Sequence, residues 1–567
     1  MSILNPTSHD DGLSHAKAAS WLTLLALLLY LPGFFSLPPM DRDEPRFAQA
    51  SKQMLESGDY VAIRFQDEAR NKKPVGIYWM QVAAVKAAQA AGAPEAQAKI
   101  WVYRLPSLIA AVAATLLTYW AALAFLAAPE AFVAAALMAA TILLGVEARL
   151  AKTDATVIAT VVAAMGALAR VWRGAAGAPS GWGNAAVFWS AIALGVLVKG
   201  PITPMVPFLA ATVLSIRRRS IGWLKPLRAG WGLLLVALVV APWLTLILIK
   251  TKGGFLADSV GRDMLGKVAG GQEAHGAPPG AYLAAFWGTA WPLAPFVGLA
   301  IPFVWRSRAE DATLFLLAWL IPSWLVFEAT PTKLPHYVLP LYPALAILVG
   351  LAMSRFEEAT KGVWAGLMRF WLAAAPTLIV VAAFGAAAWF GTLAEGAVSV
   401  RGLIGLALAA ATVALAYSAQ ARLKAEDATG AAMRAVGASA ALSALAFGVV
   451  MSGPLFKPFQ MSPRLAQAGR AALEAAGCGR GQGMATAGYR EPSLVFLTRT
   501  DLGMTDGPGA ARFLAEGPCR LAFVDRRDEP GFKTTAPGVT PVSRVAGVNL
   551  NGGRALDVGV YVSGERK

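Results

Sequence analysis

Acidic and basic residues stand side by side in two motifs that adjoin apolar stretches of the sequence. The motif DRDEPR contains Asp43, Glu44 and Arg46, and the motif EARLAKTDAT contains Asp154. Carboxylates next to cations are what a phosphate-carrying lipid and an attacking nucleophile require. A structural interpretation is also open, because Asp43, Glu44 and Asp154 could each cap a helix.

Further cations lie in turn-like motifs between apolar stretches. Lys73 belongs to NKKP, Lys199 to VLVKGP, and Lys333 and Tyr337 to TKLPHY, while Arg262 lies in a long polar connection. Cations on phosphate oxygens stabilise the negative charge that grows when a bond from sugar to phosphate breaks. The alternative is that the prolines shape helix entrances and that Tyr337 is an interfacial anchor.

A metal site is one open possibility in the same polar connection. The sequence GGQEAHGAPP contains Glu273 and His275, and both side chains are ligands for divalent ions. Two ligands do not define a site, so no cofactor is assigned and a divalent metal stays an alternative.

The elements that position these motifs are predicted to be membrane helices. Of the 567 residues, 56% are hydrophobic and only 15% are charged, and apolar stretches long enough to cross a bilayer recur along the chain. The pattern predicts an all-α polytopic membrane protein with about thirteen spans. They are expected near residues 20–38, 104–125, 131–146, 155–170, 185–198, 201–216, 231–249, 281–304, 312–328, 335–353, 370–390, 402–418 and 433–452.

The positions of the basic loops predict how the chain is oriented. The net charge of +16 could suggest nucleic acid as a partner, but many basic residues lie in short loops between apolar stretches, as in a topology signal. With residues 1–19 in the cytoplasm, most basic loops are cytoplasmic. The connections 39–103 and 250–280 and the tail 453–567 are then periplasmic, which predicts a bacterial inner-membrane protein whose motifs share one face.

The tail has a mixed composition that predicts a small periplasmic α/β domain. Short apolar runs predict strands at 494–497, 521–524 and 558–562, and residues 463–476 predict a helix. Its two cysteines, Cys478 and Cys519, could form a disulfide in an oxidising compartment or remain buried thiols.

The ordered set of motifs resembles the GT-C glycosyltransferase superfamily that contains the aminoarabinose transferases and protein O-mannosyltransferases. The motifs that carry the resemblance lie within residues 20–350, and they are DEPR at 43–46, KP at 73–74, RLPS at 104–107, AR at 148–149 with Asp154, KGP at 199–201, EAHG at 273–276 and KLPHY at 333–337.

The resemblance implies a sugar donor linked to polyprenyl phosphate and an acceptor in the membrane. It implies Asp43 as a catalytic carboxylate, with Glu44 and Asp154 as further catalytic candidates. The residues implied in binding the donor phosphate are Lys73, Arg46, Lys199, Arg262, Lys333 and Tyr337. One departure is Lys72, which stands where lipid A-modifying members typically have a carboxylate. This lysine weakens the case for a metal ion shared between that position and His275, and it could signal a different acceptor.

The predicted activity is transfer of a sugar, with 4-amino-4-deoxy-L-arabinose as one candidate, to lipid A as the first choice of acceptor. Protein hydroxyls or another envelope glycan are the alternative acceptors. A single direct displacement would invert the anomeric centre. Rival interpretations are a secondary transporter and a non-catalytic scaffold, but transporters place polar groups near the midplane, whereas these charges gather at one face.

Overall fold

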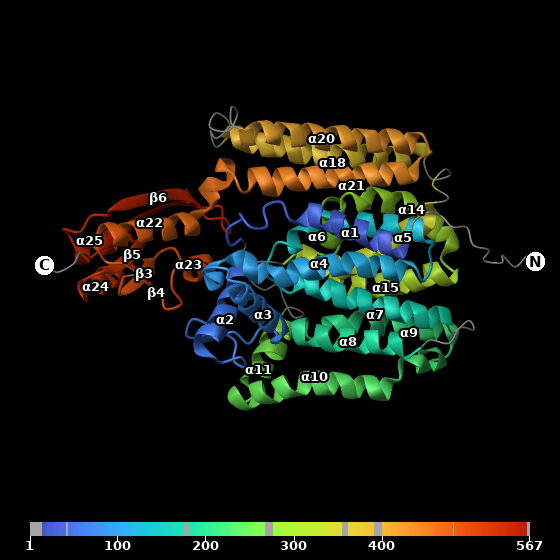
Figure 1. The fold of residues 1–567 in the computed structure, drawn as a ribbon, viewed down its shortest axis with the longest axis horizontal. Coiled ribbons are helices and arrows are strands. Elements are labelled where there is room, and N and C mark those ends of the chain that lie inside the picture. Colours follow the sequence, from blue (N-terminus) through green and yellow to red (C-terminus); the bar gives the residue numbers. More distant parts are fainter. Residues whose placement is uncertain are drawn as a thin grey trace, which may run out of the picture.

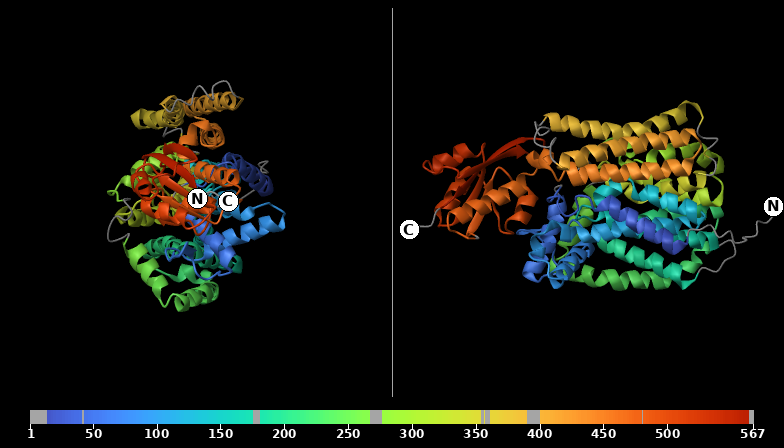
Figure 2. Two further views of the ribbon diagram at one scale, coloured as in Figure 1. Left: turned by 90° about the vertical axis from the view of Figure 1, so that its left-hand side faces the viewer. Right: turned by 45° about the horizontal axis from the view of Figure 1, so that its top comes forward.

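Helices form one elongated bundle, and a small sheet-containing unit lies at one end of it (Figure 1). The structure is a computed structural model, and it describes residues 14–40, 43–174, 181–266, 276–353, 356, 361–389, 400–479 and 481–563. Figure 2 shows that the C-terminal unit and the segment that follows the first helix lie at the same end of the bundle.

Most helices of the bundle run roughly along the long axis of the molecule (Figure 1). They are α1 (His15–Tyr30), α4 (Ile100–Ala122), α5 (Ala128–Ala139), α6 (Ile142–Glu147), α7 (Asp154–Gly174), α8 (Trp182–Lys199), α9 (Ile202–Arg218), α10 (Ala229–Lys250), α13 (Ala281–Thr289), α14 (Leu293–Ser307), α15 (Asp311–Ala329), α16 (Tyr342–Ala352), α18 (Gly362–Trp389), α20 (Val400–Lys424) and α21 (Ala428–Ser443).

The chain is a multi-pass membrane protein. Within the described residues, nine helices are long and apolar enough to cross a bilayer, and the number is ten if α13 and α14, which meet at 118°, form one broken span. Each of the thirteen expected stretches overlaps a helix, but thirteen crossings are not confirmed. The 12-residue helix α5, for example, is only about 18 Å long at 1.5 Å per residue, less than the hydrocarbon core of about 30 Å.

The segment between α1 and α4 folds into a compact unit that covers one end of the bundle. It consists of α2 (Asp43–Ser57), the hairpin β1 (Arg64–Phe65) and β2 (Glu68–Ala69), α3 (Gly76–Ala90) and η1 (Ala96–Ala98). Pro45 lies in the first turn of α2, where its missing N–H costs no hydrogen bond, and Gly58 follows the last turn with φ +72°.

The C-terminal unit is an α/β structure built on a five-stranded sheet. Its strand order is β4 (Gly503–Thr505), β3 (Gly483–Ala487), β5 (Arg520–Asp525), β7 (Ala555–Val562) and β6 (Ser543–Val548). The pairs β4–β3 and β3–β5 are parallel, whereas β5–β7 and β7–β6 are antiparallel. Four helices accompany the sheet, namely α22 (Met461–Ala475), α23 (Pro492–Leu497), α24 (Gly507–Ala515) and α25 (Glu529–Thr535).

Of the three strands predicted in this unit, two are confirmed, and so is its first helix, whereas the sheet has five strands. Residues 521–524 lie in β5, residues 558–562 in β7, and 463–476 correspond to α22. The strand predicted at 494–497 is wrong, because these residues belong to α23. Pro492 in the first turn favours a helix there, and an apolar run of four residues has no length from which to tell a strand from a buried helical turn.

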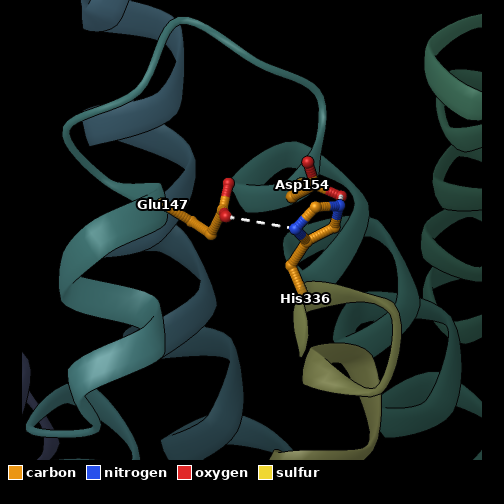
Figure 3. Close-up of side chains that lie close together, drawn as sticks. All are labelled: Glu147, Asp154 and His336. Carbon is orange, nitrogen blue, oxygen red and sulfur yellow. Dashed lines mark ion pairs between the residues drawn. The ribbon is translucent and has the colours of Figure 1, made fainter. Parts of the chain in front are cut away.

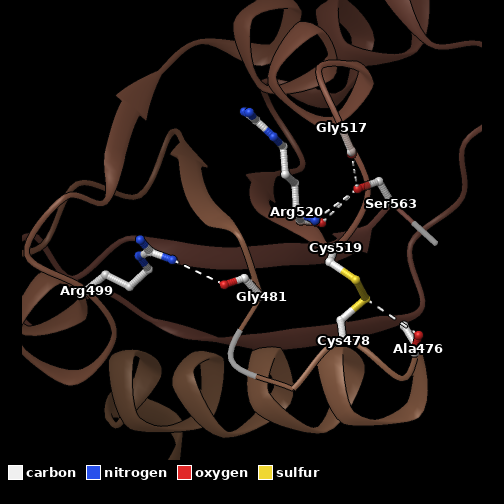
Figure 4. Close-up of a disulfide and its surroundings, with 8 residues drawn as sticks. All are labelled: Ala476, Cys478, Gly481, Arg499, Gly517, Cys519, Arg520 and Ser563. Atoms are coloured by element: carbon white, nitrogen blue, oxygen red, sulfur yellow. Dashed lines mark hydrogen bonds between the residues drawn. A yellow bond between two sulfur atoms is a disulfide. The ribbon is translucent and has the colours of Figure 1, made fainter. Parts of the chain in front are cut away.

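A disulfide joins Cys478, just after α22, to Cys519, just before β5 (Figure 4). This finding decides the question that the sequence leaves open. The bond links two segments that are 41 residues apart in the sequence, so it fastens the first helix of the unit to its central strand.

The C-terminal unit contacts α2 through the loop that follows α23. The side chain of Gln49 donates a hydrogen bond to the hydroxyl oxygen of Thr500, and that hydroxyl donates one to Glu56. Lys52 donates to the carbonyl of Phe496 from the same face of α2. The helix that begins at Asp43 is thus supported by the C-terminal unit.

Candidate active site

A solvent-open cavity of about 720 Å³ lies at the end of the bundle that α2 and α3 cover. Residues from several connections line it, as the sequence analysis expects for residues on one face. The lining residues are Asp43, Phe47, Arg70, Lys72, Lys73, Lys152, Thr153, Asp154, Lys199, Asp263, Thr332, Leu334, His336 and Tyr337. Five of these side chains are lysines or arginines and three are aspartates, so the lining favours an anion.

Asp43 enters the cavity from the first turn of α2 and is surrounded by cations. Its Oδ1 lies 4.0 Å from an Nη of Arg70 and 3.8 Å from an Nη of Arg46. Burial by itself would raise the pKa of Asp43, but the charges of Arg70, Lys152 and Arg46 together hold that pKa below its usual value. Asp43 is therefore ionised at neutral pH.

Asp154 and Lys199 form a buried ion pair at the adjoining ends of two spanning helices. Asp154 is the first residue of α7 and Lys199 is the last residue of α8, and the lysine Nζ donates a hydrogen bond to Oδ1 of the aspartate. The Lys199 ammonium also lies 5.1 Å from the ring centroid of Tyr337, a cation–π distance. The ion pair therefore packs against Tyr337, which also lines the cavity.

Lys73 lies between the hairpin and α3 and pairs with an acid from the other long connection. Its Nζ is 2.8 Å from Oδ2 of Asp263, in the π-helical segment η3 (Ala257–Leu265). The contact joins two connections that are 190 residues apart in the sequence. Lys73, which the sequence analysis selected from the motif NKKP, therefore lines the cavity.

Glu147, Asp154 and His336 lie together (Figure 3), and the last two of them line the cavity. Nδ1 of His336 is 3.6 Å from Oε1 of Glu147, and its Nε2 is 3.7 Å from Oδ1 of Asp154. One potential ligand atom from each side chain lies within 4.8 Å of the others, so the three residues have types and spacing that could hold a divalent ion. The ammonium groups of Lys152 and Lys199 already contact the two carboxylates, however, and would compete with an ion for them.

Glu44 follows Asp43 in the sequence but points away from the cavity. Its carboxylate is fully buried and accepts hydrogen bonds from Nε and Nη2 of Arg104 at 2.6 and 2.9 Å. It also accepts bonds from the backbone N–H groups of Met40 and Ala151. With its oxygens engaged in this way, Glu44 is placed to hold α2 on α4, and its predicted catalytic role has no support from the geometry.

Three of the cations predicted to bind the donor, Arg46, Arg262 and Lys333, also lie outside the cavity lining. The side chain of Arg262 is 85% exposed and pairs with Asp258 on its own helical segment. Lys333 is buried, and its Nζ donates hydrogen bonds to the carbonyls of Glu328 and Thr330. Arg262 and Lys333 adjoin lining residues, Asp263 and Leu334, so the sequence locates the correct segments but not the side chains that face the cavity.

The remaining metal candidates, Glu273 and His275, lie outside the described residues. Arg46 pairs with Asp43 one turn along α2 and does not line the cavity.

Arg70, Lys152 and Asp263 line the cavity but were not among the predicted site residues. Arg70 stacks its guanidinium 4.9 Å from the ring centroid of Phe47, and Nζ of Lys152 lies 3.5 Å from Oε1 of Glu147. Lys152 belongs to the motif EARLAKTDAT and stands two residues before Asp154. That position in the motif is the sequence signal that could have selected it. Arg70 and Asp263 belong to polar connections in which no pattern separates them from their neighbours.

Comparison with known proteins gives two kinds of similarity. The family model described as dolichyl-phosphate-mannose-protein mannosyltransferase matches residues 73–245. The curated relatives include undecaprenyl phosphate-alpha-4-amino-4-deoxy-L-arabinose arabinosyl transferases. That of Erwinia tasmaniensis is 28% identical over 59% of this chain and 59% of its own length, and one from Pseudomonas fluorescens is 26% identical over 63% and 62%. The chain thus aligns with about three fifths of the length of these relatives.

The similarity of the folds extends over nearly the whole chain. The crystal structure of ArnT from Cupriavidus metallidurans bound to undecaprenyl phosphate superposes with a TM-score of 0.71, covering 96% of this chain and 98% of that one at 18% identity. The chain has the GT-C glycosyltransferase fold. The resemblance inferred from the motifs is thereby confirmed. The oligosaccharyltransferase AglB of Archaeoglobus fulgidus is a more distant GT-C neighbour, with a TM-score of 0.51 and 12% identity.

Proposed function

We propose that this GT-C protein transfers a sugar from a polyprenyl-phosphate carrier to an acceptor in the membrane. The observation that carries the proposal is the cavity, in which cations from separate connections surround Asp43 and Asp154. A lipid phosphate bound there would lie beside Lys73 and Lys199, whose charges would stabilise it as it leaves the sugar. The similarity to arabinosyl transferases that use undecaprenyl phosphate supports this class of donor.

The electrostatics at Asp43 favour a phosphate as the acceptor. A carboxylate whose pKa lies below its usual value is a weak base and is poorly suited to take a proton from a hydroxyl group. A phosphate acceptor is already an anion and needs no such base. We therefore put lipid A first as the acceptor, with 4-amino-4-deoxy-L-arabinose as the sugar, and Asp43 then acts by orienting and stabilising the reacting sugar. In a single displacement the anomeric centre is inverted.

A second candidate acceptor is a protein hydroxyl. The match of residues 73–245 to the mannosyltransferase family model favours it, as does Lys72 in the place of a typical carboxylate. The two acceptors differ in their need for a base. With a hydroxyl acceptor the rate of transfer should follow the ionisation of Asp43 and rise with the basicity of that carboxylate.

We further propose that the cavity and the C-terminal unit face the periplasm in a bacterial inner membrane. The basic loops support this orientation, because Arg217, Arg218 and Arg219 end α9 at the end of the bundle opposite the cavity. A carrier embedded in the membrane would then present its phosphate at the outer surface.

The decisive experiment supplies the purified full-length protein, in vesicles, with polyprenyl-phosphate aminoarabinose and lipid A. We expect lipid A to gain the mass of one sugar residue with the wild-type chain. The D43N variant should insert into vesicles equally well and transfer at least about 100-fold more slowly, the scale on which loss of an electrostatic group acts in other sites. Transfer by D43N at the wild-type rate would remove Asp43 from the mechanism.

Mass spectrometry of the envelope from matched deletion and complemented strains identifies the natural acceptor. Sugar-modified lipid A should disappear on deletion and return on complementation. Unchanged lipid A together with loss of a protein-linked sugar would instead select the hydroxyl acceptor. If no sugar-modified component changes, the transferase proposal is wrong and the transporter and scaffold interpretations regain weight.

A further inference from the structure

The short turn η4 (Pro335–Tyr337) contacts both members of the buried ion pair Asp154–Lys199. His336 faces the aspartate, with Nε2 at 3.7 Å from Oδ1, and Tyr337 places its ring 5.1 Å from the lysine ammonium. Two consecutive residues of a single turn therefore contact the carboxylate and the ammonium of the ion pair. Pro335 restricts the backbone at the start of this turn, which limits how far both rings can move.

The other nitrogen of His336 faces a second carboxylate (Figure 3). Nδ1 lies 3.6 Å from Oε1 of Glu147, which itself lies 3.5 Å from the ammonium of Lys152. Lys152, Glu147, His336, Asp154 and Lys199 thus form a row in which each carboxylate stands between the imidazole and a lysine. Such a row keeps two buried carboxylates apart and leaves each with a cation of its own.

We propose that His336 is a positioning residue that fixes the carboxylate of Asp154 in the transferase site, with Glu147 anchoring its ring from the opposite side. This inference rests on the proposed function. The separations of 3.6 and 3.7 Å are longer than direct hydrogen bonds, and contacts of this kind tighten when a site closes on its substrate. In this role His336 acts through Asp154 and keeps that carboxylate aimed at the donor.

Two amide variants separate the two contacts of the ring. Glutamine carries its amide nitrogen near the position of Nε2, and asparagine carries its amide nitrogen near that of Nδ1. If the contact with Asp154 is the one that matters, H336Q should keep most of the wild-type kcat. H336N and H336F should lose about 10- to 100-fold in kcat, the size of effect that a misplacement of about 1 Å produces. The KM for the donor should change little in all three variants.

A measurement that needs no sugar transfer tests the same contact. Thermal unfolding of the purified full chain is compared for H336F, D154N and the double variant. If His336 holds Asp154, the decrease in Tm of the double variant should be smaller than the sum of the two single decreases. Additive decreases would overturn the proposal. Because this readout is independent of activity, a wild-type chain that transfers no sugar would count against the proposed function alone.

Activity with and without a chelator separates positioning from metal binding. Wild-type transfer should be unchanged in excess EDTA, and the purified chain should gain no bound Zn²⁺ that H336Q lacks. Loss of transfer in EDTA with recovery on addition of Zn²⁺ or Mg²⁺, together with a bound metal ion that H336Q lacks, would overturn the positioning role and make Glu147, Asp154 and His336 a metal centre. Equal activity of H336Q, H336N and H336F would also overturn it.

Discussion

The guanidinium of Arg104 and the carboxylate of Glu44 form a fully buried, two-point ion pair between α4 and α2. Arg104 also donates hydrogen bonds to the backbone carbonyls of Phe34, Leu37 and Pro38, so it ties the connection between α1 and α2 to the same point. The first turn of α2, and with it Asp43, is held in place by this arginine.

Removing one partner of this pair should destabilise the protein. In E44Q the Arg104 charge stays buried without its carboxylate, and breaking a buried pair in this way costs about 3–5 kcal/mol. We expect a clear decrease in the Tm of the purified chain. The neighbouring D43N, measured under the same conditions, should retain the wild-type Tm within a few degrees. A wild-type Tm for E44Q would contradict the structural role assigned to Glu44.

Lys73 and Arg262 should differ sharply although the sequence predicts the same role for both. Lys73 lines the cavity, whereas Arg262 is exposed and lies outside the lining. K73Q should raise the KM for the polyprenyl-phosphate donor about 10-fold or more, because it removes a charge that stabilises the bound phosphate. R262Q should stay within a factor of two of wild type. Kinetics in vesicles at varied donor concentration measure both, and similar KM values for the two variants would place the phosphate elsewhere.

The pH dependence of transfer should reveal the cations around Asp43. The lowered pKa of Asp43 keeps the carboxylate charged as pH falls towards its ordinary pKa of about 4, so wild-type activity should persist in mildly acidic buffer. R70Q removes the largest of the opposing charges and raises the pKa of Asp43. The activity of R70Q should therefore be lost at a higher pH than that of the wild type as the buffer is made more acidic. Identical acid limbs for R70Q and R262Q would show that Asp43 does not titrate in the measured step.

Labelling in intact cells tests the proposed orientation. Glu68 is exposed on the hairpin near the cavity, and Arg219 is exposed after α9 at the opposite end of the bundle. A membrane-impermeant thiol reagent applied to spheroplasts should label E68C and not R219C. After cell lysis it should label both variants. Labelling of R219C alone in spheroplasts would reverse the orientation, and the cavity would then face the cytoplasm.

Long apolar stretches and short motifs gave most of the fold and part of the site. Asp43, Lys73, Asp154, Lys199 and Tyr337 all line one cavity, and the sequence could select them because each belongs to a motif at the end of an apolar stretch. Such ends lie close together when the connections that carry them fall on the same side of the membrane.

The sequence could not show which way neighbouring side chains point. Asp43 and Glu44 are adjacent residues of similar chemistry, yet one enters the cavity and the other pairs with Arg104 inside the protein. The same holds for Arg262 and Asp263, of which only the aspartate lines the cavity. These directions depend on helix rotation and on partners about 60 to 190 residues away, which no local pattern contains.

Helix α2 is supported at two places, once by the membrane bundle and once by the C-terminal unit. Its first turn rests on the membrane bundle through Glu44, and Gln49, Lys52 and Glu56 rest on the C-terminal unit. Because both supports act on one helix, the position of Asp43 depends on the C-terminal unit as well as on the membrane bundle.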